Sequence, residues 1–447
     1  MRSAILRARE NHIAKMVITF VMDQYGETSN GTTMTAKRFA DVLQKKGHEV
    51  RVLTASDVAG EGIYVLPEYR LPVFQSIVDK QGMKFAQPDA EIMRKAIEGS
   101  DVVHMLMPFR AQKAAFEIAE QMRIATTAAF HIQPENFTYS VHLGKWGAAN
   151  QFIYWFLRTK FYKKFHYIHC PSLMMKNLLI KHKYRGHIYA ISNGVGEAFC
   201  KKETVRPEKY RDKYVILMIG RYSKEKRQDL IIKAIGNSKY NDRIQLVLAG
   251  KGPTEQKLRK LGDKYLKNPV DFVFLGQEEL IDLINSCDLY VHASDAESEA
   301  ISCMEAFTCG LVPVISDSKV CATKQFALTD RNLFRKGDCE SLREQIEWFI
   351  EHPQEKEDLS QKYLDYAKQF AIDACVDRMV EVFEHAVEDN KTRWENADKE
   401  SEYTAGLPEK ERRRYEKNKK KYLRACDKRG EPDFLDGYIR TVCATKA

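Results

Sequence analysis

The chain of 447 residues lacks the features that would mark a membrane-spanning or secreted protein. No apolar run approaches the roughly 20 residues that a membrane-spanning helix requires. Residues 1–15 contain no apolar core of the kind that a secretory signal has, and we take them as an N-terminal extension. The ten cysteines are scattered and include no Cys-x-x-Cys pair, which argues against a zinc site or a disulfide framework. Unpaired cysteines are typical of a reducing compartment, so we expect a cytoplasmic location.

The sequence also lacks the signatures of nucleic-acid-binding modules: zinc-finger spacing, an RNP-like aromatic strand and a helix-turn-helix pattern. A net charge of +9 nevertheless indicates an anionic partner, such as a phosphorylated ligand, a nucleic acid or an acidic membrane surface. We favour phosphate and membrane, and we keep a basic nucleic-acid-binding protein as the non-enzyme alternative.

Short apolar runs alternate with amphipathic helical stretches along most of the chain. The runs are apolar throughout, as strands covered on both faces should be. This repetition predicts parallel sheets with right-handed crossovers, because consecutive parallel strands need a helix between them. The expected strands lie at 17–22, 50–55, 101–107, 124–131, 167–170 and 188–192, and then at 214–220, 244–250, 270–276, 289–294 and 311–316.

The series restarts near Tyr214, after the basic passage KKETVRPEKYRDK at 201–213. We therefore predict an α/β protein with two Rossmann-like domains that face a central cleft, where ligands bind at the carboxyl ends of the strands. The expected parts are the extension at 1–15, domains at 16–196 and 197–372, a helix at 373–395 that packs back on the first domain, and a charged C-terminal extension at 396–447 whose most basic block is 410–424.

Two cations follow the strand at 214–220, within the segment IGRYSKEKRQDL at 219–230. Arg221 supplies a planar fork of donors and Lys226 a compact charge, so the two together can hold a diphosphate. A solvated basic turn is the plain alternative. The position at the carboxyl end of a strand favours ligand binding.

Two glutamates are separated by seven residues in ESEAISCMEAFTCG, at 297–310. We expect a helix from about Ala300, with Glu297 in the loop before it and Glu305 more than one turn inside it. The two carboxylates would then contact different parts of one elongated ligand, while free N–H groups around Ile301 bind its anionic part. A sugar nucleotide has that layout. An acidic first turn beside an ordinary surface glutamate is the alternative.

These two motifs together resemble those of the family 4 retaining glycosyltransferases, which have the GT-B fold. The Glu-x7-Glu pattern is followed by Ala-x-x-Cys-Gly-x-x-Pro-Val and preceded by Gly-Arg-x-x-x-Glu-Lys, as in that family. The resemblance spans about Met16 to Glu388. Further matching segments are SNGTT (29–33), KKGHEVRVLT (45–54), ISNGV (191–195), LAGKGP (248–253) and FLGQ (274–277).

The resemblance implies a role for each matching residue. Arg221 and Lys226 would neutralise the departing diphosphate, Glu297 would hold the donor sugar, and Glu305 the ribose hydroxyls. His131, at the end of a predicted strand, matches a histidine that reaches the reacting sugar. The remaining donor-binding candidates are Gly31, Gly220, Gly250, Gln277, Ala300, Ile301 and Ser302.

One departure from the family pattern concerns Glu299 and Ala300, which stand where the family has an aromatic residue and a glycine. Alanine keeps its position small. A glutamate at 299 is expected to change the polarity of the sugar pocket.

The activity that the resemblance implies is retaining transfer of a hexose, with UDP-glucose as the best-matched donor. Cleavage of the anomeric C–O bond leaves negative charge on the diphosphate, where Arg221, Lys226 and the helix terminus would stabilise it. Retention would place acceptor attack on the leaving-group face, with the donor phosphate taking the proton. Because no Asp-x-Asp signature is present, we expect no metal, and no cofactor besides the nucleotide-sugar substrate.

An aromatic and basic stretch, NQFIYWFLRTKFYKKFHYIHC at 150–170, belongs to the first domain. Such a helix can lie in a membrane interface, with aromatics towards lipid and cations against anionic headgroups. A core-packed helix whose cations face water is the alternative. The candidate membrane contacts are Trp155, Phe156, Lys160, Lys163 and Lys164, with the block 410–424 as a second contact.

The acceptor side resembles that of glucosyltransferases acting on diacylglycerol, including the loop HIQPENFTYS at 131–140. We therefore expect a lipid acceptor such as diacylglycerol and a peripheral location on the inner face of the cell membrane. Two enzyme alternatives remain: a transferase that extends a capsular or other surface polysaccharide on a polyprenyl carrier, and a sugar-nucleotide epimerase of the same architecture. Salt-sensitive RNA binding without UDP-sugar turnover would favour the non-enzyme alternative.

Overall fold

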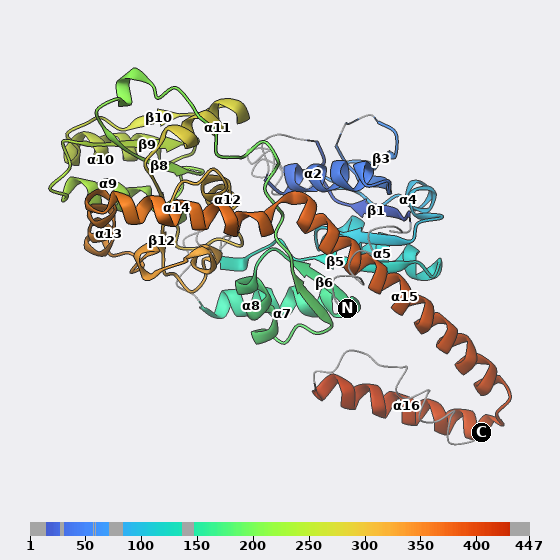
Figure 1. The fold of residues 1–447 in the computed structure, drawn as a ribbon. Coiled ribbons are helices and arrows are strands. Elements are labelled where there is room, and N and C mark those ends of the chain that lie inside the picture. Colours follow the sequence, from blue (N-terminus) through green and yellow to red (C-terminus); the bar gives the residue numbers. More distant parts are fainter. Residues whose placement is uncertain are drawn as a thin grey trace, which may run out of the picture.

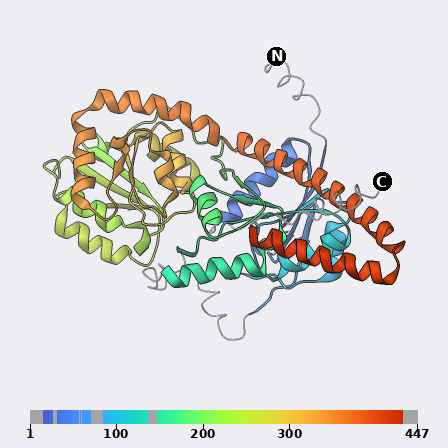
Figure 2. The ribbon, with the colours of Figure 1, turned by 90° about the horizontal axis from the view of Figure 1, so that it is seen from below.

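Two parallel β-sheets flanked by helices form the two domains of the chain (Figures 1 and 2). The computed structural model describes residues 15–26, 31–56, 58, 60–70, 84–135 and 147–429; the N-terminal extension up to residue 14, positions 136–140 and residues 430–447 lie outside the described part. Every strand pair within the two sheets is parallel. The predicted fold class, two Rossmann-like α/β domains, is confirmed.

The first domain contains a seven-stranded sheet of order β3-β2-β1-β4-β5-β6-β7. The order reverses between β1 and β4, and such a reversal opens a crevice at the carboxyl ends of the strands. The strands are β1 (Val17–Val21), β2 (Glu49–Thr54), β3 (Ile63–Val65), β4 (Val102–Met105), β5 (Ala125–Ala129), β6 (Tyr167–Cys170) and β7 (His187–Ala190). The helices are α2 (Gly31–Lys45), α4 (Ala90–Ile97), α5 (Arg110–Gln121), α7 (Gly147–Lys160) and α8 (Leu173–Lys181).

The second domain contains a six-stranded sheet of order β10-β9-β8-β11-β12-β13, with its reversal between β8 and β11. The loops that follow these two central strands therefore border the crevice. The strands are β8 (Tyr214–Ile219), β9 (Ile244–Ala249), β10 (Asp271–Val273), β11 (Leu289–His292), β12 (Pro313–Ser316) and β13 (Leu333–Phe334). The helices are α9 (Gln228–Gly236), α10 (Glu255–Tyr265), α11 (Gln277–Ser286), α12 (Ile301–Thr308), α13 (Cys339–Glu351) and α14 (Pro353–Ala367).

Short 3-10 helices complete the connections. They are η1 (Tyr162–Lys164), η2 (Glu208–Tyr210), η3 (Lys224–Lys226), η4 (Ala322–Phe326), η5 (Asp330–Asn332) and η6 (Lys368–Phe370).

The chain crosses between the domains twice, and the two crossings are paired with each other. Val195 in the first crossing forms a parallel bridge with Ala371 in the second. Its N–H donates to the carbonyl of Phe370 at 2.8 Å, and its carbonyl accepts from Ile372 at 3.1 Å. After the second crossing, α15 (Ile372–Ala405) packs against α2 and β5, where Val376, Met379 and Phe383 join the core of the first domain.

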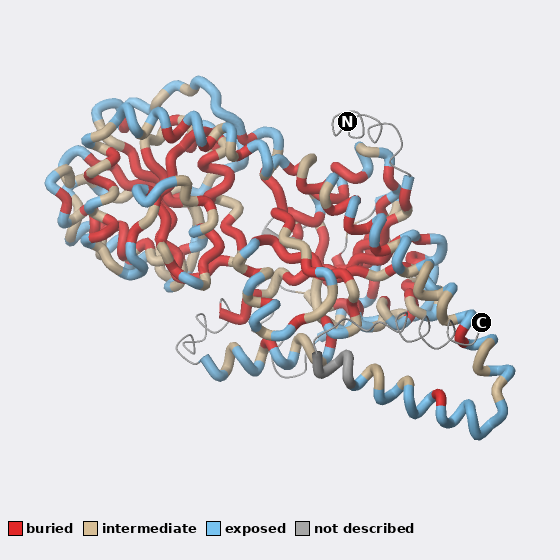
Figure 3. Tube along the Cα trace, turned by 60° about the horizontal axis from the view of Figure 1, so that its bottom comes forward, coloured by how far each residue is buried: buried red, intermediate tan, exposed pale blue. Residues whose placement is uncertain are grey.

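Helix α15 is longer than the segment expected at 373–395, and the extension beyond it is also helical. Helix α16 (Glu409–Arg429) follows and is largely exposed (Figure 3). Polar contacts hold this hairpin: Glu400 accepts from Tyr415 at 3.0 Å and from Lys419 at 2.6 Å. Apolar periodicity does not reveal α16 or the part of α15 beyond residue 395, because the contacts between them are formed by charged and hydroxyl groups.

Candidate active site between the domains

Lys226, which is partly exposed, and the buried Glu297 form an ion pair where strands β8 and β11 end. Lys226 closes η3, after β8, and Glu297 lies in the loop between β11 and α12. The two loops meet because β8 and β11 are neighbours in the sheet. His292 and Ser294 also donate to Oε1 of Glu297, each at 3.2 Å. Two residues predicted for the site are therefore in direct contact.

The pair keeps both of its groups charged at neutral pH. Burial by itself raises the pKa of Glu297, but Lys226 and His292 outweigh that effect and lower this pKa to about 2. Burial by itself lowers the pKa of Lys226, and Glu297 outweighs it and raises the pKa. Burial lowers the pKa of His292, which is neutral and donates from Nε2. An anionic group that enters here meets a protonated lysine.

Glycines bring the loops after β8 and β9 into backbone contact. Gly220 and Gly250 have φ angles of 156° and 152°. A Cβ on Gly250 would overlap the carbonyl oxygen of Gly220, and a Cβ on Gly252 would overlap the backbone of Tyr222. These contacts fix the course of the loop that carries Arg221.

Arg221 is exposed and precedes Lys226 by five residues. Unlike Lys226, it forms no ion pair within the described part of the chain. Within the described part of the chain, no side chain bonds to its guanidinium group. The backbone carbonyl of Arg221 accepts a hydrogen bond from Nε2 of Gln228 at 3.0 Å. The planar fork of Arg221 is therefore available to a ligand.

Ala300 starts α12 from a left-handed backbone conformation, with φ of 68° and ψ of 65°. This conformation costs an L-residue roughly 1–2 kcal/mol relative to the right-handed region. It turns the chain into the helix directly after the loop of Glu297. No described group accepts a hydrogen bond from the N–H of Ile301 or Ser302, so the helix terminus retains free donors for an anion.

Glu305 reaches across to the first domain. Its Oε1 lies 3.9 Å from Nη1 of Arg38, on α2. Burial raises the pKa of Glu305 to about 7, and Arg38 offsets this only in part. The proposed ribose-binding carboxylate therefore already faces a cation of the opposite domain.

Glu299 points towards the link between the domains. Its carboxylate accepts from Oγ of Ser192 at 2.6 Å and from the backbone N–H of Asn193 at 2.8 Å. The amide of the Asn193 side chain donates to its other oxygen. Burial raises the pKa of Glu299 to about 7. The acidic side chain is turned towards the interdomain link because that link supplies three donors.

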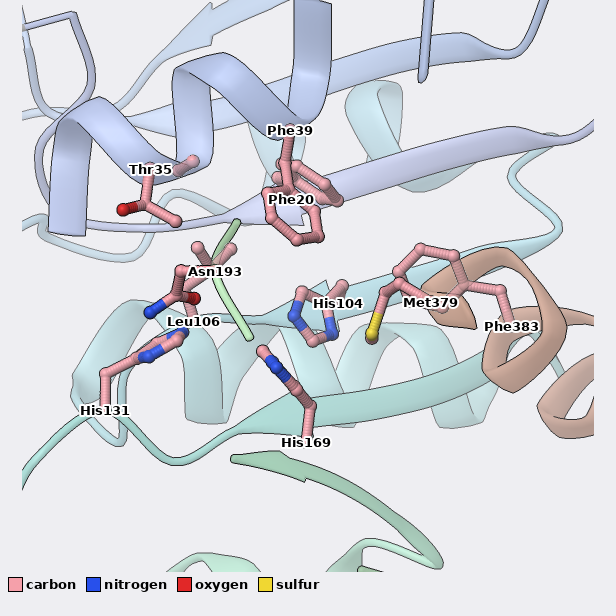
Figure 4. Close-up of a pocket in the computed structure, with 11 residues that line it drawn as sticks. Phe20, Thr35, Phe39, His104, Leu106, His131, His169, Asn193, Met379 and Phe383 are labelled. Atoms are coloured by element: carbon pink, nitrogen blue, oxygen red, sulfur yellow. The ribbon is translucent and has the colours of Figure 1, made fainter. Parts of the chain in front are cut away.

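His131 lies at one end of a cavity between the first sheet, α2 and α15 (Figure 4). Asn193 and Thr35 border the same end. The ring of His169 is 5.5 Å from the ring of His131, centroid to centroid. Burial, together with the nearby His169, lowers the pKa of His131 to about 3. His131 is thus a neutral imidazole at physiological pH.

Two buried polar residues of the first domain serve its fold, and two of the donor-binding candidates begin helices. His104 is buried and bonds to Thr127 at 2.8 Å. Asp23 accepts from Gln112 at 2.8 Å. Gly31 is the first residue of α2, and Gln277 is an exposed first residue of α11.

The aromatic side chains of the stretch at 150–170 divide between the surface and the core. Phe152, Trp155 and Phe156 are 61%, 48% and 46% exposed. Five other aromatics of the stretch are buried in the core of the first domain: Tyr154, Phe161, Tyr162, Phe165 and Tyr167.

The cations of this stretch also divide. Lys160 and Lys163 are exposed. Lys164 instead pairs with Glu117 at 3.6 Å and lies over the ring of Phe116. We therefore drop Lys164 from the candidate membrane contacts, because its charge is already used within the fold.

Among residues 15–26, 31–56, 58, 60–70, 84–135 and 147–429, no helix is both long and apolar enough to cross a bilayer. The same residues contain no group of three or more His, Cys, Asp or Glu side chains arranged to hold a metal ion.

Sequence reasoning missed three contributors to this site: Arg38, Asn193 and His292. Arg38 reads as an ordinary charge on an amphipathic helix. Asn193 lies inside the segment ISNGV, which the sequence marks only as a link between domains. His292 ends β11, and a histidine at a strand's carboxyl end was a signal that could have been used.

Two family models match the chain, one for each domain. "Glycosyltransferase Family 4" matches residues 29–198, and "Glycosyl transferases group 1" matches residues 201–369.

Several known proteins are similar to this chain. A GDP-mannose-dependent alpha-mannosyltransferase of Corynebacterium glutamicum is 26% identical over 322 residues, which are 68% of this chain and 72% of that protein. The structure of Anabaena HepE in complex with UDP and glucose is 16% identical, with a TM-score of 0.62, and the match covers 83% of this chain and 100% of HepE. The catalytic domain of cholesterol-alpha-glucosyltransferase from Helicobacter pylori is 40% identical over 35% of this chain and 99% of that domain, with a TM-score of 0.33.

Proposed function

The chain belongs to the family 4 glycosyltransferases, has the GT-B fold, and we propose that it is a retaining hexosyltransferase that moves a sugar from a nucleotide donor to a membrane lipid. The observation that carries this proposal is the position of Lys226, held charged by Glu297 at the switch point of the second sheet. A nucleotide diphosphate bound there would meet Lys226, the fork of Arg221 and the free N–H groups of α12.

These groups suit the charge that the reaction develops. When the anomeric C–O bond breaks, its electron pair stays on the diphosphate, and the sugar becomes oxocarbenium-like. Fixed donors and cations stabilise that developing charge without reorganising at the moment of reaction, and in many enzymes such stabilisation supplies most of the rate enhancement. The acceptor hydroxyl attacks on the leaving-group face, and its proton passes to the donor phosphate. No side-chain base and no metal ion are required in this scheme.

We propose UDP-glucose as the donor. The Anabaena HepE structure, which is similar in fold, holds UDP and glucose. GDP-mannose is the second candidate, because the Corynebacterium relative is dependent on it. Glu305 would contact ribose hydroxyls that both nucleotides share, so discrimination falls to the contacts of the base and of the sugar.

A lipid acceptor is supported by one face of the molecule. Helices α7 and α16 lie on the same side of the first domain (Figures 1 and 2). Helix α7 exposes Phe152, Trp155 and Phe156 there, and α16 contributes a dense set of exposed cations. Aromatic side chains anchor in the bilayer interface, and basic ones attract anionic headgroups at about 1 kcal/mol per charge. This face would hold the acceptor side of the cleft near a membrane.

A donor and acceptor screen tests the catalytic part of the proposal. Purified protein is incubated with UDP-, GDP- and ADP-sugars, alone and with diacylglycerol, a polyprenyl phosphate or a sterol in mixed micelles. The expected result is transfer to diacylglycerol from UDP-glucose with retained anomeric configuration. Transfer only to the polyprenyl carrier would support the polysaccharide alternative, and inversion or hydrolysis of donor without any acceptor would support the epimerase.

Co-sedimentation with anionic vesicles at low salt tests the membrane part. Wild-type protein should sediment, and Trp155→Ser with Phe156→Ser should stay in the supernatant. Phe274→Ser is the matched control, because Phe274 is 65% exposed but belongs to the second domain. Equal sedimentation of all three proteins would remove α7 from the membrane contact.

A further inference from the structure

The carboxylate of Glu299 bonds to the segment that links the two domains, and not to the loop that contains Glu299 itself. The residue lies two positions after Glu297 and is only 3% exposed. All three of its described hydrogen-bond donors come from Ser192 and Asn193, which lie more than a hundred residues earlier in the chain. A carboxylate can accept several bonds at once, and a buried one is costly unless it does.

The segment that Glu299 binds is the hinge region of the molecule. Val195, two residues after Asn193, pairs with Ala371 in the second crossing. Gly194 has a φ of 76°, and a Cβ there would lie 2.7 Å from Cα of Ile372. The two crossings are thus closely packed, and any relative rotation of the domains must be accommodated at this place.

The same loop touches the first domain at neighbouring points. Oγ of Ser172, at the start of α8, donates to the carbonyl of Ser298 at 2.7 Å. Nε2 of Gln133 donates to the carbonyl of Val320 at 2.8 Å, and Val320 in turn accepts from the N–H of Glu297. The loop before α12 is therefore one of the parts of the second domain that the first domain holds in this arrangement.

Asn193 connects this attachment to the acceptor side. Its side chain borders the cavity end where His131 lies, while its amide and backbone N–H both donate to Glu299 (Figure 4). A displacement of the link would thus change the position of a residue beside His131 and of the loop that carries Glu297.

We propose that Glu299 is a positioning residue whose carboxylate fastens the loop of Glu297 to the interdomain link, so that the two halves of the active site keep one spacing. It acts through Ser192 and Asn193 and does not touch substrate. The kinetic part of this inference rests on the proposed transferase activity, but the structural part does not.

Glu299→Gln tests the inference with a side chain of nearly the same size. The amide has one acceptor oxygen in place of two, and it turns an N–H₂ group towards donors that need an acceptor. We expect faster deuterium exchange at 191–196 and at 297–303 in the ligand-free protein. We also expect turnover to fall by about 10- to 100-fold, while the dissociation constant for UDP alone changes less than about threefold. Ser192→Ala removes one of the donors and should give a smaller change in the same direction.

Glu347→Gln is the matched control. Glu347 is also buried and also accepts from a serine hydroxyl and a backbone N–H, those of Ser238 at 2.8 Å and Lys239 at 3.0 Å, but within one domain. Replacement of Glu347 should raise deuterium exchange near residues 238–240 only and leave turnover unchanged.

Unchanged deuterium exchange at 191–196 in Glu299→Gln would overturn the inference, as would unchanged turnover. Should Glu299→Gln fail to fold, Ser192→Ala decides by the same two readouts. If wild-type protein turns over no donor, the proposed function fails. The deuterium-exchange experiment still tests whether Glu299 fastens its loop to the interdomain link.

Discussion

The ammonium group of Lys226 and the carboxylate of Glu297 are hydrogen-bonded across 71 residues of sequence, at the edge where two neighbouring strands end. Each group holds the other in its charged form despite burial. A pair of this kind gives little net stability, because desolvation offsets much of the attraction. Its value is to hold a cation in place at the carboxyl ends of β8 and β11.

Replacing Lys226 by Met should both abolish turnover and destabilise the protein. Loss of a fixed cation at a developing anion costs about 100- to 1,000-fold in turnover. It also leaves the Glu297 charge buried without its partner, a loss of about 3–5 kcal/mol in unfolding free energy. Initial-rate kinetics and chemical denaturation measure the two effects. The double variant Lys226→Met/Glu297→Gln should recover most of the stability and none of the activity; recovery of both would exclude Lys226 from catalysis.

Replacing Arg221 by Ala should lower turnover without destabilising the protein. Its guanidinium group is exposed and makes no described contact, so the melting temperature should stay within about 1 °C of wild type. Turnover should still fall about 100-fold, since the fork would bind the diphosphate. Lys224→Ala, an exposed cation of the same turn, is the comparison and should retain activity. Near-normal kinetics of Arg221→Ala would end its assignment to the donor site.

Replacing Ala300 by Gly should not destabilise the protein, unlike most substitutions in a buried helix start. Glycine relieves the left-handed backbone strain, which stabilises the folded state by roughly 1–2 kcal/mol. Glycine also gives the unfolded chain more conformational freedom, which lowers the stability by about 0.5–1 kcal/mol. Ala300→Val should lower the melting temperature, because a β-branched residue rarely adopts this conformation. A clear loss of stability in Ala300→Gly would contradict the strained geometry of this turn.

The stability of the protein should depend on pH through Glu305. Its folded-state pKa of about 7 exceeds the ordinary value of 4.5, so the folded protein binds the proton more tightly than the unfolded chain does. The stabilising contribution of the proton is complete below pH 4.5 and is lost as pH rises to about 7, a change of about 3 kcal/mol. Glu305→Gln, measured by urea denaturation from pH 4.5 to 8, should lose less stability over this interval than wild type. Parallel curves for the two proteins would argue that Glu305 has an ordinary pKa.

Activity should be insensitive to chelation. The proposed stabilisation of the leaving group uses Arg221, Lys226 and backbone N–H groups, which need no ion. Dialysis against EDTA should leave the turnover number unchanged, and added Mg²⁺ should not raise it. A loss that Mg²⁺ or Mn²⁺ restores would show that a metal takes part.

The sequence allowed the central strands to be predicted because they are buried on both faces and are therefore apolar along their length. The two strands it did not reveal, β3 and β13, are edge strands of three and two residues. An edge strand pairs on one side only and needs no long apolar run. Leu333–Phe334 is too short to stand out from a loop.

The chemical groups of the site were predictable where they follow a strand, as Arg221 and Lys226 do. The direction of a side chain was not. The contacts of Glu299 with Ser192 and Asn193 could not be predicted, because partners a hundred residues away leave no local pattern. Arg38 was passed over for the same reason, since its partner Glu305 belongs to the other domain.

The paired crossings also decide the order in which the protein can be completed during synthesis. The core of the first domain includes residues of α15 as late as Ala386, which the ribosome makes only after the whole second domain. At typical elongation rates the N-terminal half must wait on the order of 10–40 s for its last helix. Nascent chains halted before α15 should therefore expose apolar surface around α2 and β1 that no finished molecule presents.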